Sequence, residues 1–201
     1  MNTSIIDLDL THEAPHSPRN RIAGFAIASR AVDKCRASAA GTLGEYHYDC
    51  PLDNVLFSFK GITGQQFKSA VESSKTYEEI GTWLLSHGHP KTSAEVKTWS
   101  DEVEAGSPMK SDEKRDAFIH NCSILGLIAE TSTGFDLLEA DDKASFKQQP
   151  PSHKQETNGK TTALTPVIDE PKMYKTGNDL RRSITRKNRR RGFNRTTLNL
   201  P

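Results

Sequence analysis

The spacing of apolar residues predicts a long helix near the start of the chain. The residues that repeat at intervals of three and four are Phe25, Ala28, Val32, Cys35 and Ala39. This spacing places all five on one helical face. Ser17 followed by a proline is typical of a helix start, and Gly41 is typical of a helix end. The pattern therefore predicts a helix from Ser17 to about Gly41.

Helical spacing of apolar residues continues to residue 146. Pro51 marks a second helix start, and Thr63 is suited to cap a third helix. Thr76 and Thr92 are each followed three residues later by a glutamate, which is the pattern of a capping box. We find no sustained alternation of apolar and polar residues of the kind that a strand shows. The sequence predicts an all-α domain of six or seven helices.

Charge divides the chain into a body and a tail. Residues 1–150 carry a formal charge of −7, and residues 151–201 carry +8. The last segment is poor in aliphatic residues and cannot bury enough apolar surface to offset its ordering entropy. We therefore expect an N-terminal arm at 1–16, an all-α domain at 17–147, a disordered linker at 148–179 and a basic tail at 180–201.

The cysteines and the apolar runs indicate where the protein resides. Cys35, Cys50 and Cys122 are an odd number without a CxxC pair, which argues against a disulfide framework. The first ten residues lack the basic start of a secretory signal, and the longest apolar runs are too short to span a bilayer. We expect a soluble cytoplasmic protein that has no membrane segment.

The segment from Gly41 to Asp53, GTLGEYHYDCPLD, is the most distinctive part of the sequence, and we call it the corner. Its two glycines, its proline and its mixture of acids, tyrosines, histidine and cysteine favour a shaped turn between two helices. With Asp33-Lys34 before it and Phe135-Asp-Leu-Leu138 after it, this motif resembles a bacterial family known only as a domain of unknown function, over residues 8–146. That family has Asn where this chain has Asp49. The resemblance implies a small soluble domain and no particular activity.

Charged and aromatic residues near the corner are candidates for ligand binding. They are Glu45, Tyr46, Asp53, Arg30 and Lys34. An alternative is that the charges on the first helix form its solvated face. Because alanines flank them on that helix and leave little room for long side chains, an ion pair such as Asp33–Arg36 could be partly covered there.

Cys50 with His47 is a candidate catalytic pair. A cysteine at a helix N-terminus is favoured as the thiolate, and a nearby histidine is able to accept its proton. The alternative is a buried cysteine beside a hydrogen-bonded core histidine.

Metal binding is a weaker hypothesis. The candidate ligands are His12 and His16, His47 with Cys50, and His87 with His89. None of these spacings matches a recognised metal motif, so we predict no metal site.

The tail is a candidate for nucleic-acid contact. Its basic residues, with no acid between them, are Arg181, Arg182, Arg186, Lys187, Arg189, Arg190, Arg191 and Arg195. Such a strip binds phosphate backbones by counterion release. A solvated tail, or a tail that docks on the acidic body, remains the alternative.

The hypothesis that the sequence favours is a binding module that contacts an unknown small molecule or protein through the corner. A cysteine-dependent enzyme and an accessory nucleic-acid binder are the alternatives. No feature of the sequence identifies a cofactor.

Overall fold

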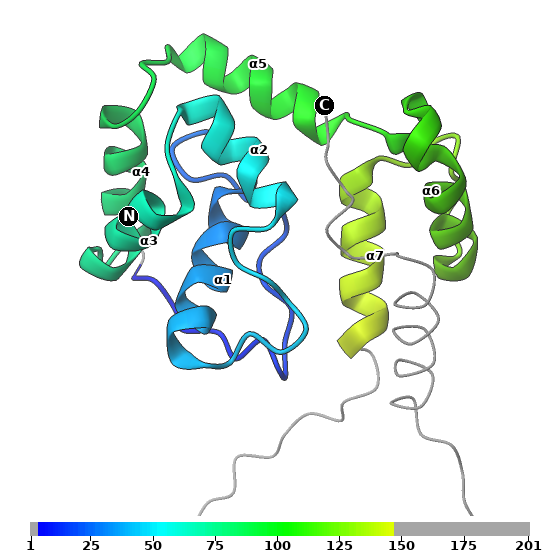
Figure 1. Cartoon of the computed structure of the whole chain (residues 1–201), viewed down its shortest axis with the longest axis horizontal. Helices are drawn as coiled ribbons and strands as arrows, with labels where there is room; N and C mark the ends of the chain where they lie inside the picture. Colours follow the sequence, from blue (N-terminus) through cyan, green and yellow to red (C-terminus); the bar gives the residue numbers. More distant parts are fainter. Residues whose placement is uncertain (1–3, 147–201) are drawn as a thin grey trace, which may run out of the picture. The chain divides into compact units, whose positions relative to one another are not determined.

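The structure is a computed structural model that describes residues 4–146, and this part of the chain forms seven α-helices, one short 3₁₀ helix and no named strand (Figure 1). The elements are α1 (Ala28–Ala40), α2 (Pro51–Lys60), α3 (Gly64–Ser73), α4 (Tyr77–Ser86), α5 (Ser93–Glu104), η1 (Pro108–Lys110), α6 (Asp112–Leu125) and α7 (Gly134–Phe146). The predicted all-α class is confirmed. The linker and the basic tail lie outside the described residues.

The helix ends follow local sequence chemistry. Thr63, Thr76 and Thr92 each accept a hydrogen bond from the backbone N–H three residues later, at 3.2 Å in every case. In return, the side chain of that third residue accepts from the N–H of the threonine, so all three capping boxes are complete. Gly41 and Gly61 end α1 and α2 in the left-handed conformation.

The predicted start of α1 at Ser17 is wrong. The helix begins at Ala28, and residues 17–27 form turns in which Ala23 and Ile27 have φ values of 49° and 71°. These positive values are incompatible with a continuous right-handed helix. Phe25 is fully buried in this loop. Phe25 therefore lies three residues before Ala28 as part of a buried loop, and its apolar character does not indicate a helical turn.

Two hydrophobic clusters stabilise the domain. The larger one includes buried residues of α1 to α5 and, from α7, Phe135. The smaller one contains Phe118 and Cys122 of α6, Ala129, and Leu137 of α7. The N-terminal arm joins the core through Leu10, which is 1% exposed. Because α7 contributes to both clusters, it connects α6 to the rest of the domain.

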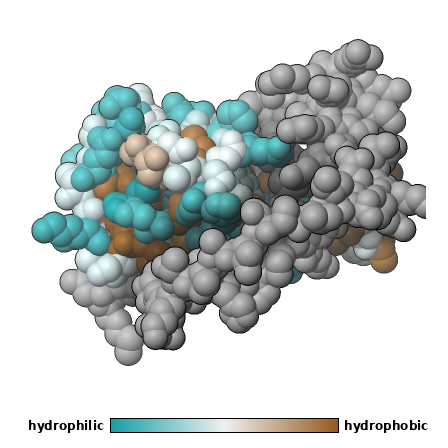
Figure 2. All heavy atoms as spheres, turned by 90° about the horizontal axis from the view of Figure 1, so that it is seen from below, coloured by the Kyte–Doolittle hydropathy of each residue, from teal (hydrophilic) through white to brown (hydrophobic). Residues whose placement is uncertain are grey.

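The surface of the described residues is mixed in character. On the face that Figure 2 shows, apolar side chains lie between hydrophilic ones. The large apolar residues that are exposed are Ile6, Leu85, Ile119, Ile124 and Ile128. No helix within residues 4–146 is long and apolar enough to cross a membrane.

Candidate functional site

The charged face of α1 is buried rather than solvated. Arg30, Asp33 and Lys34 have exposed fractions of 3%, 0% and 2%. They lie three and four residues apart, which groups them on one side of the helix. Residues of the N-terminal arm, the corner, α4 and α7 contact these three side chains. The interpretation of this face as a solvated surface is therefore wrong.

Lys34 joins α1 to the start of α2. Its Nζ lies 2.6 Å from Oδ1 of Asp53 and donates a hydrogen bond to Sγ of Cys50 at 3.2 Å. Asp53 is fully buried, and its Oδ1 has this close ion pair but no contact with hydrogen-bond geometry. Its other oxygen accepts from the backbone N–H of Cys50 at 3.4 Å. One lysine thus holds a buried carboxylate and a half-buried thiol together.

Arg30 makes a second buried ion pair, with α7. Its guanidinium contacts both carboxylate oxygens of Asp142, at 2.7 and 3.2 Å. The hydroxyl of Tyr46 donates to the same carboxylate at 2.7 Å, and the guanidinium lies 5.4 Å from the centre of the Tyr46 ring. Burial disfavours the charged guanidinium, but the bonds to Asp142 outweigh this effect and raise the pKa of Arg30. The pair connects α1, the corner and α7.

Asp33 completes a buried charged cluster, in which Arg30, Asp33 and Lys34 of α1 meet their partners Asp142, His16, Asp53 and Cys50. Its Oδ2 accepts from the backbone N–H of His16 at 2.6 Å and lies 2.8 Å from Nδ1 of the same histidine. The hydroxyl of Tyr77 is 3.5 Å from the other oxygen. Burial raises the pKa of Asp33, although the contacts with His16 oppose this shift. The side chain of His16 is 33% exposed, so this pair reaches the surface.

Two backbone positions shape the corner. Gly44 has a φ of 59°, and a Cβ at this position would lie 2.7 Å from the carbonyl oxygen of Leu10. Asp49 has a φ of 56°, a region that Asp and Asn enter more readily than other side chains. Its carboxylate accepts from the side-chain amide of Asn54 at 2.9 Å. The corner is therefore a defined turn that places Cys50 at the N-cap of α2.

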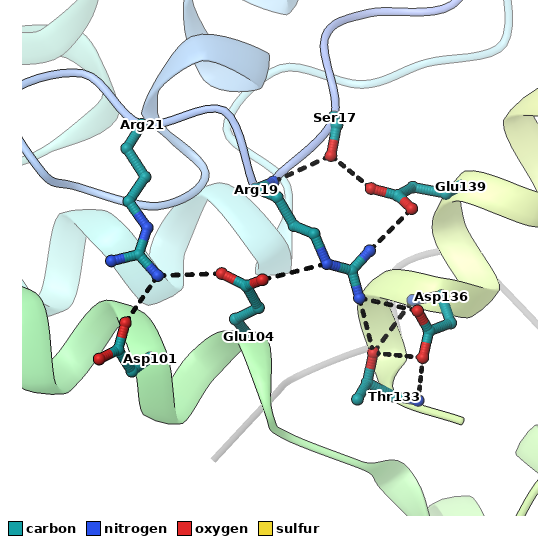
Figure 3. Close-up of polar contacts among 8 residues, drawn as sticks. All are labelled: Ser17, Arg19, Arg21, Asp101, Glu104, Thr133, Asp136 and Glu139. Atoms are coloured by element: carbon teal, nitrogen blue, oxygen red, sulfur yellow. Dashed lines mark hydrogen bonds and ion pairs between the residues drawn. The ribbon is translucent and has the colours of Figure 1, made fainter. Parts of the chain in front are cut away.

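An ionic network fixes α7, and with it Asp142. Arg19 contacts three carboxylates, those of Glu104, Asp136 and Glu139, at 3.2, 2.8 and 2.7 Å (Figure 3). Arg21 contacts Glu104 as well, at 2.9 Å. These bonds connect the loop before α1 to the end of α5 and to the first turns of α7.

The structure brings together most, but not all, of the residues that the sequence suggested. Lys34, Asp53 and Cys50 meet directly, and Arg30 meets Tyr46 beside Asp142. The remaining two, Glu45 and His47, are exposed. Within residues 4–146, the sulfur of Cys50 is contacted by Lys34, and no hydrogen bond links it to His47. The suggested ion pair between Asp33 and Arg36 is also replaced, because Arg36 pairs with Asp7.

The histidines considered as metal ligands have other surroundings. His16 binds Asp33, and the backbone carbonyl of His89 accepts from Nζ of Lys60 at 2.8 Å. A Cβ on Gly88 would meet the carbonyl oxygen of Lys60 at 2.0 Å, so this turn packs tightly on the end of α2. Within residues 4–146, no group of three or more metal-ligating side chains is present.

Two residues of the cluster, Asp33 and Asp142, were not predicted as site residues, and His16 was considered only as a metal ligand. Asp33 and His16 are 17 positions apart, and Asp142 is 112 positions from Arg30. The placement of Asp33 between Arg30 and Lys34 is the one local signal, because three charges so close together on an alanine-rich helix are suited to burial in pairs. Nothing local identifies Asp142.

A shallow hollow of about 440 Å³ lies elsewhere, against α3 and α4. Uncharged side chains line it, including Gln66, Ser69, Trp83 and His87. It does not reach the corner, so it offers no binding space for a ligand of Cys50.

Comparison with known proteins places the chain in a family without assigning an activity. A search of curated proteins finds no match. A family model described as "Domain of unknown function (DUF5069)" matches residues 12–144, which is more than half of the chain. We conclude that the chain belongs to the DUF5069 family.

Proposed function

We propose that this domain is a binding module and that the corner is its contact surface. The observation that carries the proposal is the buried charged cluster beneath the corner, which reaches the surface through His16, Tyr46 and Cys50. These three side chains are partly exposed, whereas Arg30 and Lys34 behind them are buried.

Energetics support a role for this cluster beyond stability. Removing several charges from water is expensive, and apolar residues of similar volume often stabilise a core as well or better. Buried ionic groups with shifted pKa values gather at functional sites, although structural networks also contain them. Imidazole, phenol and thiol groups that each contact this buried cluster suit a polar ligand, either a small molecule or a polar segment of a partner protein.

A thermal-shift screen of polar metabolites tests this proposal. We would compare the wild type with His16→Gln and Cys50→Ser, and use His120→Gln as a matched control because His120 is an exposed histidine on α6. A ligand of this surface should raise the melting temperature of the wild type and of the control, and the shift should shrink in His16→Gln and in Cys50→Ser. Shifts that survive unchanged in both of these variants would place binding elsewhere.

Thiol chemistry at Cys50 is a second candidate function, favoured by the contact with Lys34. An ammonium 3.2 Å from sulfur interacts more favourably with a thiolate than with a thiol. Cys35 and Cys122 are buried, at 1% and 0%, and burial raises the pKa of Cys35 to about 11. Cys50 is therefore the accessible thiol, and Lys34 rather than His47 is its contacting partner.

Iodoacetamide labelling followed by peptide mapping tests this second function. At neutral pH, Cys50 should react well before Cys35 and Cys122, and faster than in the unfolded chain. Labelling of Cys50 at or below the unfolded rate would remove the nucleophile hypothesis.

The three cysteines are all free, which is what a reducing compartment favours. On this basis we infer the cytoplasm as the location of the domain. We also propose nucleic acid as a partner of the basic tail, on the ground of its charge pattern alone.

A further inference from the structure

We propose that Cys50 and Lys34 form a reversible covalent bond when the thiol is oxidised by a peroxide. The two atoms that would join, Sγ and Nζ, are already in contact at 3.2 Å. Cys50 is partly exposed as a residue, which favours access of a small oxidant, whereas the side chain of Lys34 is only 3% exposed. This inference does not require that the corner bind a ligand.

The cysteine does not stand alone in this arrangement. Lys34 is a buried amine directed at the sulfur, and Asp53 is a buried carboxylate 2.6 Å from that amine. Oδ1 of Asp53 has no hydrogen bond in addition to this ion pair. The cluster therefore contains an oxidisable sulfur, a nucleophilic nitrogen and an oxygen that accepts a proton.

The chemistry takes two balanced steps. In the first, the sulfur attacks hydrogen peroxide, the O–O bond breaks, and the products are a sulfenic acid and water; the sulfur is oxidised by two electrons and the peroxide is reduced. In the second, Nζ transfers a proton to Asp53 and attacks the sulfur. The S–O bond breaks, and the hydroxyl leaves as water with a further proton from Nζ. The product is a sulfenamide, Cys50–S–NH–Lys34.

A disulfide is the competing fate of a sulfenic acid, and the structure disfavours it. Cys35 and Cys122 are buried, and all three cysteines within residues 4–146 are free, with the sulfur of Cys50 in contact with Lys34 instead. The nitrogen of Lys34 is the nucleophile that is already in place. The new bond would tie the middle of α1 to the first residue before α2 and close the corner into a covalent loop.

Peptide mapping of the peroxide-treated wild type tests the bond directly. The intact protein should lose about 2 Da, because formation of the bond removes two hydrogens overall. Trypsin should no longer cut after Lys34, so residues 31–36 should remain attached to the peptide 37–60 that contains Cys50. Dithiothreitol should restore both the mass and the cleavage.

The variant Cys35→Ala/Cys122→Ala separates this bond from a disulfide. Its only remaining thiol is Cys50, so a monomer that still loses about 2 Da must have bonded its sulfur to another kind of atom. The proposal would be overturned if this variant keeps its full mass after peroxide treatment while the treated wild type loses about 2 Da and trypsin still cuts it after Lys34. That result would show that the wild type forms a disulfide. A gain of about 16, 32 or 48 Da at Cys50 without cross-linking, or no change at all, would also overturn the proposal.

Discussion

Replacing Gly44 by valine tests whether the corner depends on a positive φ at this position and on a close contact with Leu10. This glycine has a φ of 59°, where a β-branched residue is strained. A Cβ would also lie 2.7 Å from the carbonyl oxygen of Leu10 and 3.3 Å from Cα of Thr11. Both of these neighbours are backbone atoms, and Leu10 is 1% exposed, so the arm cannot move aside without disturbing a buried residue.

The size of the effect follows from these two causes. Strain at a positive φ costs about 1–3 kcal/mol, and forcing atoms into a packed site adds about 1–3 kcal/mol. Loss of glycine flexibility in the unfolded chain offsets about 0.4–1 kcal/mol. We therefore expect Gly44→Val to lower the free energy of unfolding by about 1–5 kcal/mol.

Gly41→Val is the matched control. Gly41 has a φ of 74°, but a Cβ there would meet nothing within 4 Å. This variant should show the backbone strain alone, about 0–3 kcal/mol after the same offset, and should lose less stability than Gly44→Val. Urea unfolding followed by circular dichroism would measure both variants. Equal losses at Gly41 and Gly44 would refute the inferred contact with Leu10, and an unchanged stability of Gly44→Val would refute the turn itself.

Four further predictions concern the buried charges and the tail. In urea unfolding, Asp142→Ala should lower the free energy of unfolding by about 3–5 kcal/mol, because it leaves the buried Arg30 guanidinium without its carboxylate. The control is Lys97→Met, which removes an exposed ion pair and should change the free energy of unfolding by less than about 1 kcal/mol. Burial raises the pKa of Asp33 above 3.8, so the folded state binds this proton more tightly than the unfolded chain. The stability that this proton contributes is complete below pH 3.8 and is lost as the pH rises through the raised pKa of folded Asp33. Asp33→Asn should flatten that part of the curve of unfolding free energy against pH. Parallel curves for the wild type and the variant would contradict this. Limited proteolysis should leave a core that ends near residue 147, and random duplex DNA should bind with a log–log salt slope of up to about −7 that disappears when 180–201 are deleted. Binding that is absent or insensitive to salt would exclude the nucleic-acid role, and protection of the tail from protease at low salt alone would favour docking on the acidic body.

Local chemistry accounts for what the sequence predicted well. A capping box depends on two residues three positions apart, so Thr76 with Glu79 and Thr92 with Glu95 could be identified without any tertiary information. The glycines that end α1 and α2 are equally local. The boundary of α1 failed because the positive φ of Ile27 is imposed by packing and by a hydrogen bond from its N–H to the carbonyl of Pro18.

The candidate site was predictable only in part, for the same reason. Cys50, Asp53 and Lys34 lie within 20 positions of each other, and a turn between two helices brings them together. The partners of Arg30 and Asp33 come from α7 and from the N-terminal arm. Their pairing depends on the complete fold, so the spacing of the charges on α1 suggested burial in pairs but could not identify the partners.

The sharing of α7 between two hydrophobic clusters implies that amide protons are not equally protected along the chain. The cluster beside α6 has four buried members, far fewer than the main one, so we expect α6 to open at a lower free-energy cost than α1 to α5. Its amides should exchange with solvent through this partial opening. The amides of α7 next to Phe135 should instead exchange with solvent at the slow rate of the main core. This helix would then be the boundary between two cooperative units.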